Sequence, residues 1–225
     1  METAVQLRRK DRVWIFVGLA IVGITLAGLM LATLRGGTGV AQPVRSFSIP
    51  STAMEPTLRI GERAFANMRA YDGQAPERGD IVVFKLPRDV ETIYVKRVVG
   101  LPGEKVQMRN GIVHIDGTAV PTADAGTYKL ALQGEPEKSA RLKRETLPNG
   151  VTYTVLDLID NGFYDNTPVY QVPERHYFML GDNRDNSTDS RVLNQVGYVP
   201  HANVIGRISW IFFSPDLSRI GTVPK

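Results

Sequence analysis

Three segments that lie far apart in the chain carry residue types able to do chemistry. Residues 48–58 read Ser-Ile-Pro-Ser-Thr-Ala-Met-Glu-Pro-Thr-Leu, a second segment contains Lys96, and residues 181–191 read Gly-Asp-Asn-Arg-Asp-Asn-Ser-Thr-Asp-Ser-Arg. Hydroxyls and amines are the groups from which nucleophilic catalysis is built. If the fold brings the segments together, they could supply a nucleophile, its base and a supporting scaffold.

Lys96 lies within Thr92–Gly100, the run that most strongly predicts a β-strand. Side chains alternate along a strand, so Lys96 shares a face with Tyr94 and Val98. Burial among such neighbours disfavours the charged form and lowers the pKa of a lysine. The neutral amine can then act as a general base near neutral pH. The alternative is that Lys96, like Arg97, is an ordinary exposed residue on a half-buried strand.

Residues 181–191 contain three acids, two arginines and two serines, a density unlike that of a solvated turn. Carboxylates can cap backbone donors and form bidentate pairs with arginine, which would lock the loop. The pattern predicts a rigid polar scaffold that presents one group to a site. A structural turn is one alternative. A calcium loop is another, but the spacing does not match the EF-hand, which needs a glycine at position 6 and ligands through position 12.

The backbone of residues 48–58 is expected to be stiff, because Pro50 and Pro56 restrict φ on either side of Ser51–Glu55. A stiff segment of small residues suits a preorganised nucleophile and oxyanion hole. A proline-rich turn without a catalytic role is the alternative.

The composition excludes several other chemistries. The 225 residues include no cysteine, which rules out disulfides, thiolate catalysis and cysteine-bound zinc. His114, His176 and His201 are scattered without a metal-binding spacing, so we predict no metal and no cofactor. Residues 1–35 carry five Lys or Arg and two Asp or Glu, whereas the remainder carries 22 and 21. The basic excess is therefore N-terminal, and we expect no nucleic-acid partner.

Residues 13–34 contain no charged side chain. As a helix they would span about 33 Å, which matches the ~30 Å hydrocarbon core of a bilayer. Because a basic cluster in residues 1–12 precedes them, the positive-inside rule predicts a transmembrane anchor with residues 1–12 in the cytoplasm and the rest of the chain outside. Residues 35–45, rich in glycine, are interpreted as a short tether. A cleaved signal peptide and a buried soluble helix are the alternatives.

Beyond the tether the pattern is typical of β-strands, and Asn110-Gly111 is the strongest hairpin signal. Residues from about 121 to 170 are interpreted as an inserted, variable subdomain of strands and long loops, since 123–147 lack clean periodicity. Trp210–Phe213 is expected to be either a strand buried on both faces or an apolar edge that rests on a bilayer. The predicted strands are Arg63–Met68, Asp80–Lys85, Thr92–Gly100, Lys105–Arg109, Ile112–Ile115, Thr152–Ile159, Tyr177–Leu180 and Val204–Phe213.

Four motifs follow one another along the chain. They are Ser-Ile-Pro-Ser-x-x-Met-x-Pro-Thr-Leu at 48–58, Arg-Gly-Asp-Ile-Val at 78–82, Lys-Arg-Val-Val-Gly-Leu-Pro-Gly at 96–103 and Gly-Asp-Asn-Arg-Asp-Asn-Ser at 181–187. Together they resemble bacterial type I signal peptidase, also called leader peptidase. The resemblance covers the anchor and about residues 45–105 and 175–210.

The resemblance implies a mainly β fold on one N-terminal transmembrane helix. An antiparallel catalytic β domain would comprise residues 46–104 and 176–225, with an inserted β-rich subdomain at 105–175. The implied activity is removal of signal peptides from exported preproteins after small residues (Ala-X-Ala-like), at the outer side of the bacterial inner membrane. Preproteins and the lipid bilayer are the implied partners. A specialised pilin-processing peptidase and a self-cleaving repressor fit less well, because of the full 181–187 motif and the anchor.

The family uses a serine–lysine dyad, and the motifs assign its positions. The general base matches Lys96, the nucleophile's position is Ala53, and Ser51 matches a serine whose hydroxyl joins the oxyanion hole. The matching support residues are Ser187, which would orient the lysine, and Asp182, Asp189 and Arg191, which would hold the last loop.

Ala53 has no side-chain oxygen, so no acyl-enzyme can form through it. Ser51 and Thr52 are near, yet a shift of one residue moves the attacking atom by ~3 Å or more, and ~1 Å can already cost ~10²-fold. We expect a catalytically silenced chain. Either a serine was replaced in a working peptidase, or the chain is a natural inactive paralogue that binds signal peptides. The intact Lys96 and Ser187 favour the first explanation.

By resemblance, substrate peptides would add as an extended strand to two edges, Phe47–Pro50 and Ile93–Val95. Shallow apolar pockets would admit small residues at the first and third positions before the cut. Plain core packing is the alternative for each apolar residue. The implied substrate-binding residues are Phe47, Ile49, Pro50, Met54, Leu58, Tyr94 and Val95.

Overall fold

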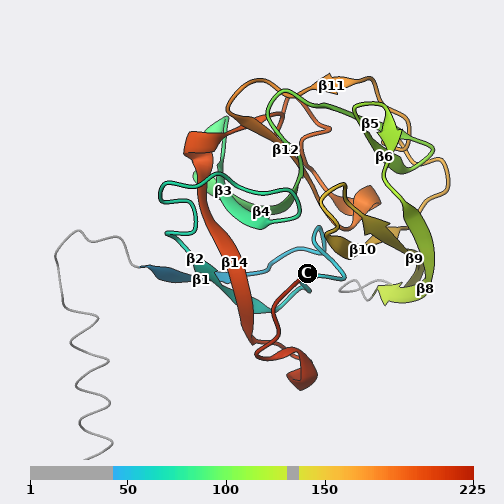
Figure 1. Cartoon of the computed structure of the whole chain (residues 1–225). Coiled ribbons are helices and arrows are strands. Elements are labelled where there is room, and N and C mark those ends of the chain that lie inside the picture. Colours follow the sequence, from blue (N-terminus) through green and yellow to red (C-terminus); the bar gives the residue numbers. More distant parts are fainter. Residues whose placement is uncertain (1–42, 131–136) are drawn as a thin grey trace, which may run out of the picture. The chain divides into compact units, whose positions relative to one another are not determined.

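The computed structural model describes residues 43–130 and 137–225, which form a mainly β structure of antiparallel sheets (Figure 1). The predicted anchor, residues 13–34, lies outside the described residues, as does most of the tether. Among the described residues there is no helix of the length and apolarity needed to span a membrane.

The largest sheet has seven strands in the order β1-β2-β14-β3-β4-β12-β13. Its strands pair antiparallel, and the long β14 lies between β2 and β3. The bounds are β1 Val44–Ser48, β2 Arg63–Asn67, β3 Ile81–Leu86, β4 Asp89–Gly100, β12 His176–Leu180, β13 Val199–Pro200 and β14 Val204–Phe213. Five of these strands, β2, β3, β4, β12 and β14, agree with the predicted ones to within three residues, because their alternating or continuous apolar patterns match their burial. The short strands β1 and β13 were not predicted.

Two small sheets contain the strands between residues 105 and 171, and they lie to the right of β3 and β4 in Figure 1. One has the order β11-β5-β6-β7 and the other β10-β9-β8. Their strands are β5 Lys105–Arg109, β6 Ile112–Ile115, β7 Thr118–Ala119, β8 Thr122–Leu130, β9 Lys138–Thr146, β10 Thr152–Asp157 and β11 Tyr170–Gln171. The division into a catalytic domain and an inserted subdomain stays a prediction.

The predicted hairpin at Asn110-Gly111 is confirmed. Both residues have positive φ, 49° and 72°, and they join the paired strands β5 and β6. This left-handed pair of residues gives a turn whose twist matches that of the flanking strands.

Residues 123–147, whose sequence lacks clean periodicity, contain most of two long paired strands that the sequence did not delimit. β8 and β9 are nine residues each and pair antiparallel from Thr122 to Leu130. Most of their side chains are exposed or half-buried, and only Leu130 and Ala140 are both apolar and buried. A strand with one buried face alternates apolar and polar residues along the sequence. Because this hairpin buries few apolar side chains, its sequence shows no such alternation.

Of the two alternatives for Trp210–Phe213, burial on both faces is wrong. Ile211 is fully buried, whereas Trp210 is 41% and Phe213 49% exposed. Trp210 and Phe212 pack against the ring of Phe65 on β2, with ring centroids 4.8 Å and 4.2 Å apart. The alternation places one face of β14 in the core and leaves the other partly open; its contact with a bilayer stays a prediction.

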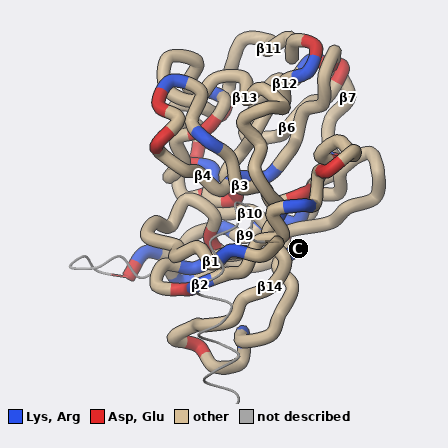
Figure 2. Tube along the Cα trace, turned by 90° about the vertical axis from the view of Figure 1, so that its left-hand side faces the viewer, with Lys and Arg blue, Asp and Glu red and all other residues tan. Residues whose placement is uncertain are grey.

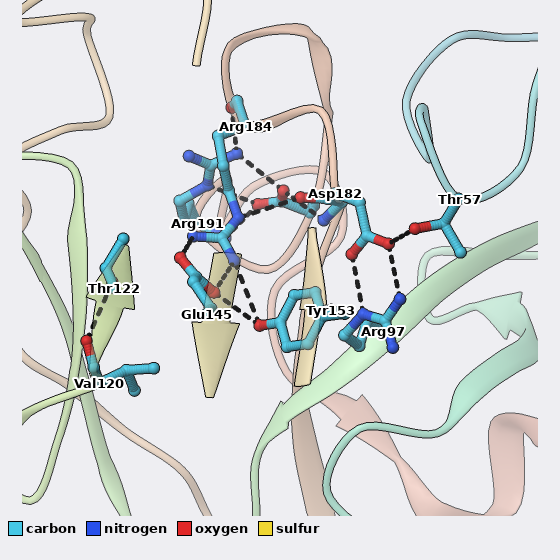
Figure 3. A network of polar contacts seen from close by, with 11 residues as sticks. Thr57, Arg97, Val120, Thr122, Glu145, Tyr153, Asp182, Arg184 and Arg191 are labelled. Carbon is cyan, nitrogen blue, oxygen red and sulfur yellow. Dashed lines mark hydrogen bonds and ion pairs between the residues drawn. The ribbon is translucent and has the colours of Figure 1, made fainter. Parts of the chain in front are cut away.

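Charged residues of both signs are interspersed along the described chain (Figure 2). Several of them are nevertheless buried, and Figure 3 shows how they are paired. Arg184, in the 3₁₀ helix η1 (Arg184–Asn186), forms two hydrogen bonds of 2.7 Å and 2.6 Å with the carboxylate of Glu145 on β9. The Tyr153 hydroxyl, on β10, donates to the same carboxylate. A small sheet is thereby tied to the segment that follows β12.

Replacing Glu145 should destabilise the protein strongly. Glu145→Ala leaves the buried Arg184 guanidinium without its counter-charge, and we expect the free energy of unfolding to fall by about 3–5 kcal/mol. Asp72→Ala is the matched control, because Asp72 forms an exposed ion pair with Arg69 and should contribute under about 1 kcal/mol. Denaturant unfolding of both variants measures the difference, and equally small effects would contradict the assigned role of Glu145.

Candidate active site

The three chemistry-bearing segments contribute to the lining of one cavity of about 550 Å³. One wall comes from the end of β1 and the loop after it, and another comes from β4. The third contribution is from the loop that follows β12. The lining residues are Phe47, Ser48, Ile49, Pro50, Ser51, Ala53, Met54, Ile93, Tyr94, Val95, Lys96, Asn186 and Thr188.

Two strand edges flank this cavity. β1 is the first strand of the seven-stranded sheet, and among the described residues it pairs only with β2. β4 pairs with β12 only between Arg97 and Gly100, so the preceding half of β4 has no partner on that side within residues 43–130 and 137–225. Since β1 and β4 are separated by three strands in the sheet order and still line one cavity, the sheet curves to bring them together.

The loop after β12 holds the backbone around Ala53. The N–H of Asn183 donates to the Ala53 carbonyl at 3.2 Å, and the Asn183 side chain donates to the Thr52 carbonyl at 3.1 Å. The side chain of Asn186 donates to the Thr52 hydroxyl at 2.6 Å. The buried Thr52 hydroxyl is thus engaged by Asn186, while Ser51 is exposed at the cavity.

The close approach of these two loops requires a glycine at position 181. A Cβ there would overlap the Ser187 side chain and lie 2.6 Å from the carbonyl oxygen of Ala53. Any other residue would push the two loops apart, so Gly181 sets the distance between them.

Lys96 is 4% exposed, and burial lowers its pKa to about 8. The nearby carboxylates of Asp189 and Asp182 act in the opposite direction but do not cancel the loss of hydration, and Arg191 adds to the lowering. Its ammonium group lies 5.7 Å from the centre of the Tyr94 ring. Within the described residues no hydrogen bond or ion pair reaches Lys96, and its side chain contributes to the lining of the cavity.

Two buried ion pairs support the loop that carries residues 181–191. Arg97, the neighbour of Lys96 on β4, donates to both carboxylate oxygens of Asp182 at 2.9 Å and 2.7 Å (Figure 3). Arg191 donates to both oxygens of Asp189 at 2.8 Å. Burial alone would raise the pKa of Asp189, but the Arg191 guanidinium and the Gly181 N–H outweigh it and lower that pKa.

Most of the predicted site residues therefore meet at the cavity, and some do not. Leu58 is fully buried in the core beneath it and is absent from the lining. Ser187 is buried, and its hydroxyl has no hydrogen-bond partner among the described residues. The predicted residues that line the cavity are Phe47, Ile49, Pro50, Ser51, Ala53, Met54, Tyr94, Val95 and Lys96.

Sequence reasoning missed several contributors. Thr188 lines the cavity, and Asn183 and Asn186 hold the neighbouring backbone. Ser48 and Ile93 also line it, and both lie in the two predicted edges. Both asparagines lie inside the 181–187 motif, so the motif could have identified them as functional residues. Their contacts with the 48–58 segment could not be predicted, because these contacts depend on the fold. In the described ranges no three potential metal ligands come together.

The lowered pKa of Lys96 predicts a pH-dependent stability. Between about pH 8 and 10.5 the unfolded chain holds a proton that the folded chain has released, so raising the pH through this window stabilises the fold. Relative to Lys96→Met, the unaltered chain should gain about 3 kcal/mol in free energy of unfolding from pH 7 to pH 10.5. Denaturant unfolding of both proteins across this range measures the gap, and a gap that stays constant would disprove the desolvation of Lys96.

Comparison with known proteins gives the family. A family model described as signal peptidase, peptidase S26, matches residues 19–213. A signal peptidase I of Rickettsia typhi is 36% identical over 198 residues, which are 76% of this chain and 73% of that protein. A signal peptidase I of Rickettsia canadensis is 44% identical over 198 residues, which are 76% of this chain and 72% of that protein. A crystal structure of a signal peptidase I from Enterococcus faecalis V583 matches with 27% identity and a TM-score of 0.36, covering 60% of this chain and 98% of that one.

The chain belongs to the signal peptidase family, peptidase S26. Within this family its relatives are type I signal peptidases, so the resemblance drawn from the four motifs is confirmed.

Proposed function

We propose that this chain carries the peptide-binding site and base of a serine–lysine signal peptidase, with catalysis silenced at Ala53. In the form with serine at this position, Lys96 would take the proton of the hydroxyl as it attacks the scissile carbonyl. The Ser51 hydroxyl and the N–H of residue 53 would stabilise the resulting oxyanion.

One observation carries this proposal. Ala53, Ser51 and Lys96 come from separate elements and line the same cavity, and Lys96 is buried with a pKa of about 8. A base must be deprotonated readily near the working pH, and a lysine in water would not be. The alternative is plain core packing, in which Lys96 has no acid–base role. Core packing does not explain why a buried lysine faces an open cavity.

The two strand edges support the proposed substrate. An extended peptide between β1 and the first half of β4 could form main-chain hydrogen bonds with both. Phe47, Ile49 and Met54 supply apolar walls on one side, and Tyr94 and Val95 on the other. These walls favour small apolar side chains, consistent with cleavage after an Ala-X-Ala-like sequence. The proposed substrates are signal peptides of exported preproteins.

The proposal includes the placement of the enzyme. Residues 13–34 would anchor the chain in the inner membrane, with residues 1–12 in the cytoplasm and the catalytic β domain on the outer side. Protease added to intact spheroplasts should then digest the domain, and complete protection from it would argue against this orientation.

Restoring the hydroxyl tests the chemistry. The Ala53→Ser variant of the full chain, in nonionic detergent, should cleave a preprotein after its signal peptide, whereas the unaltered chain should show at most trace cleavage. Gel analysis and mass determination of the new N-terminus measure the product. Failure of the variant to cleave any preprotein would sink the proposed function.

Two further variants in the Ala53→Ser background separate the roles. Adding Lys96→Met should abolish cleavage, because no base remains, and persistent cleavage would refute Lys96 as the base. Adding Ser51→Ala should lower kcat by about 10²–10³-fold with little change in KM, since an oxyanion donor acts in the transition state.

A second candidate is a natural paralogue that binds signal peptides without cutting them. The observation in its favour is that the N–H of Ala53, the Ser51 hydroxyl and the Lys96 side chain have no hydrogen-bond partner among the described residues. An Ala53→Ser variant that binds preproteins as tightly as the unaltered chain but never cuts them would favour this candidate.

A further inference from the structure

The described lining of the cavity contains one charged side chain. Of the thirteen described residues that line it, only Lys96 is ionisable near neutral pH, and no carboxylate is among them. Phe47, Ile49 and Met54 are apolar neighbours within the same lining. A mostly apolar cavity with a single cation favours a ligand that is apolar along its length and negative at one point.

Lys96 can take up a proton near neutral pH, because its lowered pKa of about 8 lies close to that pH. A serine at position 53 would offer this group a hydroxyl oxygen, but Ala53 offers none. Within the described residues the ammonium group has no hydrogen-bond acceptor and no ion-pair partner. A buried charge without a partner is costly, so an anionic ligand group would relieve that cost.

Two uncharged donors belong to the same cavity. The Ser51 hydroxyl is exposed there, and no hydrogen bond uses the N–H of Ala53 in the part of the chain that the structure describes. A carboxylate has two oxygens and accepts several hydrogen bonds, so it can engage these donors and the ammonium group together. A neutral amide or an uncut peptide bond offers one oxygen and no charge.

We infer that the cavity binds peptides through a free C-terminal carboxylate, held by Lys96, Ser51 and the Ala53 N–H, with small residues preceding it along the edges of β1 and β4. The preferred ligand is therefore a released signal peptide or another peptide that ends in a small residue, rather than the uncut preprotein. This inference rests on the peptide-binding groove of the proposed function. It adds that the groove recognises the free C-terminus of a peptide and not an uncut chain.

The charges behind Lys96 are consistent with this preference. Asp182 and Asp189 act on its pKa through space, but each is already paired, with Arg97 and Arg191 respectively. Neither carboxylate is in the cavity lining. A ligand carboxylate would therefore meet the ammonium group from the cavity side without displacing a protein carboxylate.

The test compares two forms of one peptide. A labelled peptide that ends in Ala-Leu-Ala with a free carboxylate, and the same peptide with a C-terminal amide, are titrated with the full chain in nonionic detergent at pH 7. Fluorescence anisotropy measures Kd. We expect the acid to bind at least about tenfold more tightly than the amide, as for one charge-assisted contact. The same sequence extended by six residues should bind like the amide.

Variants test whether Lys96 causes the preference for the acid over the amide. Lys96→Met should remove the difference between acid and amide, whereas Lys96→Arg should keep part of it. Lys85→Met is the matched control, because Lys85 is an exposed lysine on the neighbouring strand β3, and it should leave the difference unchanged.

The outcomes separate the two proposals. Equal binding of acid and amide, unaffected by Lys96→Met, overturns the carboxylate inference and leaves the groove of the proposed function intact. Tighter binding of the extended peptide than of the acid overturns it as well. No binding of any of the three peptides overturns the inference and the proposed groove together.

Discussion

The buried ion pair between Arg97 and Asp182 joins the three segments on which the cavity depends. Arg97 stands beside Lys96 on β4, and Asp182 begins the loop that follows β12. The hydroxyl of Thr57, from the loop that carries Ala53, donates to the same carboxylate (Figure 3). Removing one partner would leave an uncompensated buried charge, which typically costs about 3–5 kcal/mol. The geometry of the site is therefore coupled to the stability of the fold.

The alternation of β4 gives two neighbouring cations opposite environments. Arg97 faces a carboxylate and the ring of Tyr153, whose centre lies 4.0 Å from its guanidinium carbon. Lys96 faces the cavity, with no partner among the described residues. Pairing keeps the first residue permanently charged, and desolvation lowers the pKa of the second into a range where it can exchange a proton. One strand thus carries both a cation paired within the fold and a lysine that lines the cavity.

Much of the fold was predictable because apolar patterns report burial directly. Five of the seven strands of the main sheet and the Asn110-Gly111 hairpin follow from periodicity and turn chemistry. The two that were missed, β1 and β13, are short. The β8–β9 hairpin was not predictable in this way, since it has little buried apolar surface and its pairing is carried by backbone hydrogen bonds common to all residues. The exposure of Trp210 was missed for a related reason: a run of large apolar residues does not say which face meets the core.

By itself the sequence determined the chemical groups, their order and the family, and it placed Ala53 at the position where the resemblance implies a nucleophile. Tertiary structure alone decided which groups meet: Asn186 engages Thr52, Leu58 lies in the core and not in the cavity, and Lys96 is left without a described partner. These outcomes depend on the curvature of the sheet and on contacts between residues more than a hundred positions apart. Such contacts leave no local periodicity in the chain, because local patterns record only whether a side chain is buried and not what it touches.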